Sequence, residues 1–476
     1  MKKIIFSIFV TSLIFTSCDK SLVDFTEVTN PNLSEDNVVG QPNSASAWLT
    51  GIERQMALTS NEIVTISEIA SDNYVNTSTF FNQALDNLTI EIQDNDFRDL
   101  QFDIARLREM SLFGINKVAP GDINLTDETL AEFNFYKGVA FLLAGEYFSE
   151  YPIENKGTLQ NSAANFQSAI ESFNDAISLS PQAVYHLALA RAYYNLGDKI
   201  NAVSSSNTAI GLDAMLLYEI NFDQSNGPSS TIESALFARG SFDDLQPLPT
   251  LDFLDPKYSF LSNEQDQGTP FLKIEEAHFI ITEAQLSDDD LGGAKITMKD
   301  LIALISSRPT RTIDDGVEGR TENDPGSRPN VSSVTANYEG DASFKSGLIL
   351  SRDADVTIPI ISGTSITDAD VDALLTIDEA LEMLYLMRQE VFIAEGRRIV
   401  DLGVKYVLHE NELLLNSNVD EGSSALDPVI PSFIDAIKSE LDAFTYDKDA
   451  GTVTIKYNVN KILVDNRTSD LVIPFF

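Results

Sequence analysis

Four acidic side chains near position 370 are spaced like the ligands of a calcium-binding loop; they are Asp368, Asp370, Asp372 and Glu379. In an EF-hand the twelfth position carries such a glutamate, but the sixth requires glycine for a sharp turn, and here it is Ala373. The same acids fit two helix starts, because Thr367 and Thr376 each stand three positions before an acidic residue, which is the pattern of a capping box. We therefore predict two capped helices rather than a calcium site, and no metal ion or other cofactor.

The motifs of common hydrolases and nucleotide-binding enzymes are absent. The sequence contains no HExxH, G-x-S-x-G, P-loop or G-x-G-x-x-G pattern. No motif therefore indicates a zinc protease, a serine hydrolase or a nucleotide-binding enzyme. Glycoside hydrolysis needs only two suitably placed carboxyl groups. The 73 acidic residues supply many candidates, but no pair is distinguished by its surroundings. We predict a protein that is not an enzyme and has no catalytic residues, with a glycoside hydrolase as the alternative.

The chain is strongly acidic. Its 476 residues include 73 Asp and Glu against 32 Lys and Arg, for a formal net charge of −41. Nucleic-acid backbones and anionic lipid surfaces repel such a polyanion, so we expect no nucleic-acid partner. One cysteine and three histidines leave no material for an intrachain disulfide or for a zinc cluster of cysteines.

The N-terminus has the pattern of an export signal. After a basic start, residues 4–15 form an apolar run that is too short for a membrane span, which needs about 20 residues. Two small residues then precede Cys18, the chain's only cysteine. This arrangement resembles the lipobox of bacterial lipoproteins, although Phe15 stands where leucine is usual. The resemblance implies a signal peptide over 1–17, acylation of Cys18 and a tether over 18–40; an ordinary secretory signal is the alternative.

Apolar residues recur with the helical period along most of the chain. The expected helices cover residues 44–58, 98–118, 127–150, 162–179, 181–196, 199–211, 271–286, 293–306, 377–395 and 430–444. Between them lie two long proline-rich segments, 220–270 and 307–366, and loops of that length in a compact protein are usually functional or disordered. Residues 452–457 alternate like a short strand, and we expect the only tryptophan, Trp48, to pack in the first helix.

Two pairs of expected helices share a register. Ala169 and Ala176 recur 33 residues later as Ala202 and Ala209, and the spacing of Gly138, Phe141 and Gly145 returns at Ala190, Tyr193 and Gly197. This resembles tetratricopeptide repeats, which have a period of 34; chance helical periodicity is the alternative. We predict a mostly α fold, a tetratricopeptide-like scaffold of helix hairpins over 41–476, with the two long segments as loop insertions and few short strands.

A charged segment near the C-terminus carries a second resemblance. Residues 388–402 read Arg-Gln-Glu-Val-Phe-Ile-Ala-Glu-Gly-Arg-Arg-Ile-Val-Asp-Leu. This resembles the C-terminal signature of the SusD/RagB family of outer-membrane glycan-binding lipoproteins, and the matching residues are Arg388, Glu390, Glu395, Gly396, Arg397, Asp401 and Leu402. Ser71-Asp72-Asn73 resembles an early element of the same family.

The charged residues of this motif have helical spacing. In a continuous helix Glu390, Arg397 and Asp401 would share one face within about 20° of each other, with Arg388 and Glu395 on the opposite face. An interruption at Gly396 would give different partners. We expect a buried ionic clamp that locks the last repeat, because sequestered arginine pairs more often fix geometry than bind ligands; ligand contact is the alternative.

The family resemblance implies a function and partners. It implies a lipid-anchored protein of the outer membrane, facing the exterior, that binds oligosaccharide or polysaccharide and delivers it to a SusC-like TonB-dependent barrel. A peptide ligand, as for RagB-like relatives, and a pure assembly scaffold are alternatives. Sugars are bound by flat aromatic faces with amide or carboxylate partners. The side chains that the resemblance places on the ligand face are Asn73, Tyr74, Phe80, Phe81, Asn82 and Tyr338.

Overall fold

The computed structural model describes residues 39–76, 82–236, 245–257, 266–314, 329–351 and 355–476. These ranges are mostly helical with a few short strands, which confirms the predicted fold class. Cys18, the signal peptide, the tether up to residue 38, and two ligand candidates, Phe80 and Phe81, lie outside the described residues. None of the described helices is long and apolar enough to cross a membrane.

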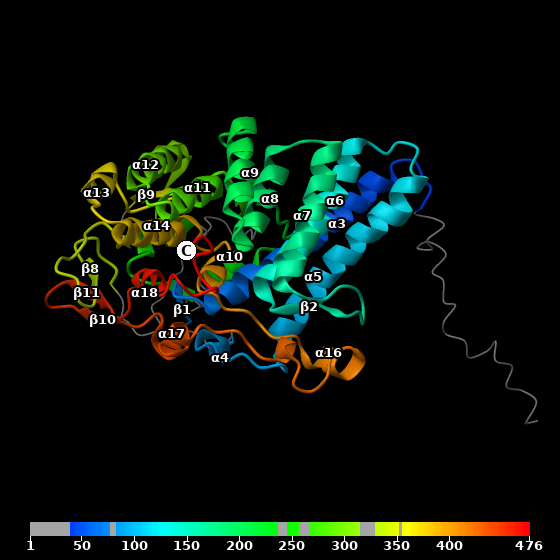
Figure 1. The fold of residues 1–476 in the computed structure, drawn as a ribbon. Helices are drawn as coiled ribbons and strands as arrows, with labels where there is room; N and C mark the ends of the chain where they lie inside the picture. Colours follow the sequence, from blue (N-terminus) through cyan, green and yellow to red (C-terminus); the bar gives the residue numbers. More distant parts are fainter. Residues whose placement is uncertain (1–38, 77–81, 237–244, 258–265, 315–328, 352–354) are drawn as a thin grey trace, which may run out of the picture.

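Long helices that follow one another in the chain pack side by side. They are α3 (Ser44–Ile69), α5 (Asn95–Phe113), α6 (Asp127–Tyr147), α7 (Ser162–Leu179), α8 (Ala183–Asn195), α9 (Lys199–Leu212), α11 (Glu275–Ser287), α12 (Leu291–Ser307) and α14 (Ile377–Val391). Figure 1 shows α3, α5, α6 and α7 together at one end of the molecule and α11, α12 and α14 toward the other. This is the arrangement of stacked helix hairpins, in which each unit buries its apolar face against the next.

The close crossing of α6 and α7 depends on glycine. A Cβ atom added at Gly138 would lie 2.5 Å from the ring of Phe173, and one at Gly145 would lie 2.6 Å from the ring of Phe166. In the next pair, Ala190 of α8 and Ala202 of α9 are fully buried in one small cluster. The small residues of the predicted repeat therefore lie where the helices approach each other.

Short strands cross-link the long segments between the helices. The antiparallel pairs are β1 (Tyr74–Asn76) with β5 (Leu245–Pro247), β2 (Glu150–Pro152) with β3 (Leu159–Asn161), β4 (Leu217–Ile220) with β6 (Thr269–Lys273), and β7 (Thr310–Asp314) with β9 (Asp355–Pro359). A three-stranded sheet joins β11 (Thr452–Ile455) to β10 (Phe444–Asp447) and, in parallel, to β8 (Thr335–Tyr338). The strand predicted at 452–457 is thus confirmed as β11.

Two of the expected helices are shorter than predicted. Residues 430–444 form only α17 (Ser432–Asp435) and a 3-10 turn before β10 begins. Helices are stabilised mainly by packing an apolar face, and in this fully described segment the buried aliphatic side chains are Pro431, Ile434 and Leu441. The helix expected over 377–395 ends at Val391. The remaining short helices are α4 (Gln83–Asp86), α10 (Thr231–Leu236), α13 (Asp368–Ala373), α15 (Arg398–Asp401), α16 (Glu410–Leu415) and α18 (Val459–Asp465).

The two predicted capping boxes are confirmed. Thr367 caps α13 and Thr376 caps α14, and in both cases the acidic residue three positions later accepts a hydrogen bond from the cap's main-chain N–H. Asp370 and Glu379 are therefore engaged with helix starts. Among the described residues, no group of three or more His, Cys, Asp or Glu side chains is arranged to hold a metal ion.

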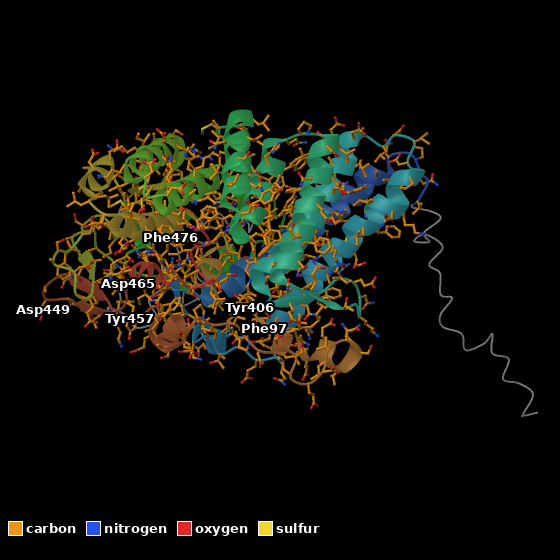
Figure 2. The ribbon with its side chains drawn as sticks, viewed as in Figure 1. Phe97, Tyr406, Asp449, Tyr457, Asp465 and Phe476 are labelled. Carbon is orange, nitrogen blue, oxygen red and sulfur yellow. The ribbon has the colours of Figure 1, made fainter. Side chains whose placement is uncertain are left out.

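The interior contains one large hydrophobic core. Tyr406 packs on Phe97 with ring centroids 4.9 Å apart in the middle of the molecule (Figure 2). Trp48 packs on Phe113 at 4.9 Å and its indole N–H donates to the main-chain oxygen of Met110 at 2.8 Å. The prediction that Trp48 is a packing residue is confirmed.

Candidate functional site

A cavity of about 410 Å³ lies between α14, β8 and the start of α18; cavities of this size are typical of small-ligand sites. We call it the α14 cavity. Its apolar wall consists of Leu348, Ile366, Leu374, Met383 and Leu386, and the half-buried ring of Tyr338 lies at its edge. Its polar lining includes Asn337, Asp341, Ser343, Lys345, Glu382, Glu390, Asn458 and Asn460.

One face of α14 forms a wall of this cavity. Glu379, Glu382, Met383, Leu386 and Glu390 follow each other at intervals of one, three or four residues, so they lie on the same side of the helix. The capping box at Thr376 fixes where this helix begins. The wall is therefore held by regular structure rather than by a loop, which favours a preformed site.

Glu390 is the least satisfied polar group of the cavity. Its Oε2 accepts hydrogen bonds from the Thr364 hydroxyl at 2.6 Å and from the Ser365 N–H at 2.9 Å. Its Oε1 accepts none from any residue that the structure describes, although the side chain is almost fully buried. Burial raises the pKa of Glu390, partly offset by the hydrogen bonds from Ser365 and Thr364. A buried acceptor without a partner is costly, so the described protein contacts leave Glu390 incompletely satisfied.

An amide, a carboxyl group and a lysine of the polar lining are held by hydrogen bonds. Asn458 caps α18 through its Oδ1 and donates from Nδ2 to Glu382 Oε1 at 2.7 Å. Burial raises the pKa of Glu382. Lys345 Nζ donates to the main-chain and hydroxyl oxygens of Ser365, both at 3.0 Å. The cavity thus offers acceptors and donors in fixed positions beside an aromatic ring, which is the combination that a sugar requires.

A buried network supports the cavity floor. Asn460 lines the cavity and donates to Gln389 Oε1 at 2.8 Å, and Gln389 donates in turn to Asn73 Oδ1 at 3.1 Å and to Asp72 Oδ2 at 3.0 Å. Asp72 holds Arg398 in a bidentate ion pair at 2.6 and 2.7 Å. The Ser71-Asp72-Asn73 element and the segment 388–402 are therefore joined behind the cavity.

The other charged residues of the 388–402 motif are buried in ion pairs. Arg388 pairs with Asp401, Glu395 with Lys273 at 2.6 Å, and Arg397 with Glu276 at 2.9 Å. The face predicted to join Glu390, Arg397 and Asp401 does not form. The reason is that α14 ends at Val391 and the chain turns through Gly396 in the left-handed region, at a φ of +74°. The pairs of Glu395 and Arg397 join residues 122 and 121 positions apart, as a clamp does, whereas Arg388 and Asp401 are 13 positions apart.

The structure separates the predicted ligand residues. Tyr338 lines the α14 cavity, whereas Asn73 is buried behind its floor and Tyr74 is buried in the core. Asn82 caps α4 and donates to Asp94 and Asp96. The sequence reasoning missed Glu382, Met383 and Asn458, and took Glu390 only for a motif residue. Glu382 and Met383 share one face of the expected helix at 377–395 with Glu390, and this helical spacing is the signal that would have pointed to them.

No protein-family model matches the chain, and no curated protein matches its sequence. Its fold is similar to solved structures. A SusD superfamily protein from Bacteroides fragilis matches with a TM-score of 0.53 at 13% identity, over 80% of this chain and 99% of that one. A SusD-like protein from Bacteroides fragilis matches at 0.51 and 9% identity, over 78% and 87% of the two chains. A SusD-like carbohydrate binding protein from Bacteroides vulgatus matches at 0.50 and 12%, over 76% and 83%. The chain therefore has the SusD-like fold.

Proposed function

We propose that this protein belongs to the SusD/RagB family, binds oligosaccharide in the α14 cavity and delivers it to a SusC-like TonB-dependent barrel. The observation that carries the proposal is the α14 cavity, where the ring of Tyr338 lies beside accessible polar side chains that hydrogen bonds hold in place. A solved protein of the same fold is described as carbohydrate binding, which supports a glycan as the ligand. The lipobox resemblance at Cys18 supports a lipid anchor, and the resemblance of residues 388–402 to the SusD/RagB signature implies the outer membrane, with the binding face toward the exterior.

The charges around the cavity indicate which glycans are excluded. The lining carries four carboxyl groups, those of Asp341, Glu379, Glu382 and Glu390, whereas Lys345 is the one cationic side chain among the described lining residues. The whole chain adds a net charge of −41. Like charges at close range in a partly buried site are unfavourable, so uronic and sulfated glycans are disfavoured and uncharged oligosaccharides are favoured.

Calorimetric titration of the mature protein with uncharged and acidic oligosaccharides tests the site. We expect binding of at least one uncharged oligosaccharide, and at least tenfold weaker binding after Tyr338→Ala, because the aromatic face is lost. The matched control is Tyr446→Ala, since Tyr446 lies in β10 of the same sheet and outside the cavity lining. Equal affinities for the two variants, or no binding of any oligosaccharide or peptide by the wild type, would refute the site.

The anchor and the partner have separate tests. Palmitate labelling in bacteria is expected to be lost in Cys18→Ala, and labelling that survives would refute the lipobox prediction.

Affinity capture on the intact outer membrane is expected to recover a large TonB-dependent barrel in complex with the wild type. Recovery of the protein alone under conditions that preserve membrane complexes would refute the transporter partnership.

A lipid-anchored glycosidase is the second candidate. The supporting observation is that Glu382 and Glu390 line one cavity and burial raises the pKa of both, as for the acid of a glycosidase pair. Turnover of chromogenic glycosides decides between the two functions. We expect no turnover; a rate that Glu390→Gln abolishes would establish the enzyme instead.

A further inference from the structure

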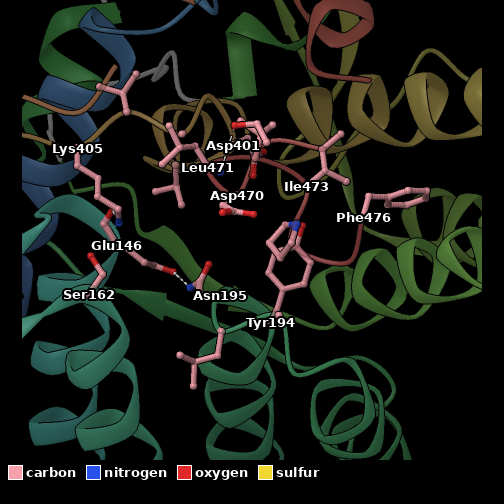
Figure 3. A pocket seen from close by; sticks show the side chains of 18 of the residues that line it. Glu146, Ser162, Tyr194, Asn195, Asp401, Lys405, Asp470, Leu471, Ile473 and Phe476 are labelled. Atoms are coloured by element: carbon pink, nitrogen blue, oxygen red, sulfur yellow. Dashed lines mark hydrogen bonds between the residues drawn. The ribbon is translucent and has the colours of Figure 1, made fainter. Parts of the chain in front are cut away.

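A second cavity, of about 390 Å³, lies between the repeat helices and the C-terminal segment 469–476, and it shares no lining residue with the α14 cavity. We call it the repeat cavity. Figure 3 shows Glu146, Asn195, Lys405 and Asp470 around it, with Ser162 at the start of α7. Polar side chains on several elements thus converge on one space of ligand size.

Glu146 is a buried carboxyl group among the residues that border the repeat cavity. It lies at the end of α6 with its side chain fully shielded from solvent. Its Oε1 accepts a hydrogen bond from Asn195 at 2.8 Å and lies 3.0 Å from Arg191 Nε, whereas its Oε2 accepts no hydrogen bond from the described residues. Glu146 is thus shielded from any ligand and instead holds the amide of Asn195, a half-buried residue of the lining.

The charges near Glu146 select the class of ligand. Arg191 and Arg397 both lie within ion-pair distance of its Oε1, at 3.0 and 3.7 Å. Lys405 Nζ is close by and donates to the main-chain oxygens of Gly145 and Glu146, at 2.6 and 3.3 Å. A cationic ligand would meet these positive groups, and an anionic ligand would meet the carboxylates of Glu146, Asp401 and Asp470. An uncharged ligand avoids both repulsions.

The walls of the repeat cavity suit a sugar ring. Apolar surface comes from Phe166, Leu471 and Val472, and the hydroxyl, amide and carboxyl groups of Ser162, Asn195 and Asp470 are distributed between these patches. Sugar rings present an apolar face and hydroxyls at the edge, so they require both kinds of contact.

We propose that the repeat cavity is a second saccharide site, which binds one or a few uncharged sugar residues with the Asp470 carboxylate accepting from a ring hydroxyl. This site is separate from the α14 cavity and does not require it. A chain with both sites would hold two sugar units at once.

The experiment uses the full mature chain carrying Tyr338→Ala, which weakens the α14 cavity. Saturation-transfer NMR is recorded with D-glucose, D-galactose, D-mannose and N-acetyl-D-glucosamine. Ala163→Trp is then added, because Ala163 is exposed, lines the repeat cavity, and makes no contact in the buried ion pairs. The matched control is Gln167→Trp, on the exposed side of the same helix and outside the lining.

We expect at least one of these sugars to bind in the Tyr338→Ala background, to bind at least tenfold more weakly after Ala163→Trp, and to be unaffected by Gln167→Trp. Asp470→Ala, at an exposed lining residue, is expected to weaken the same sugar and gives a second readout if the tryptophan disturbs α7. The proposal is overturned if none of the four sugars binds, or if neither Ala163→Trp nor Asp470→Ala changes binding. A failure of the α14 cavity alone would appear as unchanged oligosaccharide affinity in Tyr338→Ala and would leave these results intact.

Discussion

The Asp72–Arg398 ion pair provides the sharpest test of the buried clamp, through the variant Asp72→Asn. Both side chains are almost fully buried, at 4% and 1% exposure, and the two hydrogen bonds between them are 2.6 and 2.7 Å long. Burial by itself lowers the pKa of Arg398, but the Asp72 carboxylate raises it, and the net shift is upward. The guanidinium therefore stays charged, and the variant would leave that charge buried without its counterion.

The size of the effect follows from what remains around Arg398. Removing one partner of a buried ion pair destabilises a protein by about 3–5 kcal/mol. Asn460 Oδ1 still accepts from Arg398 Nη1 at 2.8 Å, so we expect the lower end, about 3 kcal/mol. The control is Asp465→Asn, whose ion pair with Lys461 is more than half exposed on both sides and should contribute only about 0.3–0.5 kcal/mol.

Urea unfolding at pH 7, followed by circular dichroism and by the fluorescence of Trp48, measures both variants. If Asp72→Asn lowers the free energy of unfolding no more than Asp465→Asn does, the reasoning is refuted. Arg398 would then not be a buried charge that depends on Asp72. The double variant Asp72→Leu/Arg398→Met removes both charges. It is expected to be more stable than Asp72→Asn, since no unpaired charge remains inside.

Two further predictions concern helix packing and pH. Gly138→Ala is expected to destabilise the protein by about 1–3 kcal/mol, because the added Cβ would overlap Phe173. The control Gly211→Ala has open space around it in α9 and should stabilise the protein by about 0.4–1 kcal/mol. Equal urea midpoints for the two variants would contradict the close crossing of α6 and α7. Burial raises the pKa of Glu68 from 4.5 to about 7, so the folded state binds more protons than the unfolded state between these values and the free energy of unfolding falls as pH rises through them. Urea unfolding at pH 5, 6 and 7.5 should show a smaller fall of the free energy of unfolding with pH in Glu68→Gln than in the wild type. An equal fall in both proteins would contradict the raised pKa of Glu68.

The features predicted correctly from the sequence are local ones. The capping boxes at Thr367 and Thr376 are each complete within four residues, so the sequence alone identifies both partners of each hydrogen bond. The small residues at Gly138 and Ala190 report a helix crossing through their spacing. Such signals depend on neighbours in the chain, which a sequence displays.

The partners of the charged motif were not predictable in the same way. Arg397 pairs with Glu276, 121 positions away, and Arg398 with Asp72, 326 positions away. Nothing in the local spacing distinguishes these carboxylates among 73 acidic residues. The same limit applies to the ligand candidates: the aromatic and amide types were appropriate for a sugar site, but burial of Asn73 and Tyr74 is set by tertiary packing that composition does not reveal.

The part of the 388–402 motif that belongs to α14 also explains why the two cavities lie on different sides of this helix. Arg388 and Glu390 are two positions apart on α14, which separates their side chains by about 200° around the helix axis. Glu390 consequently faces the α14 cavity, while Arg388 and its partner Asp401 line the repeat cavity. Because α14 lines both cavities, a rotation of this helix about its own axis would displace both walls together. The helix must therefore be prevented from rotating. The buried pair of Arg388 with Asp401 and the hydrogen bonds from Gln389 to Asp72 and Asn73 resist that rotation, so these residues act on binding by holding α14 in place.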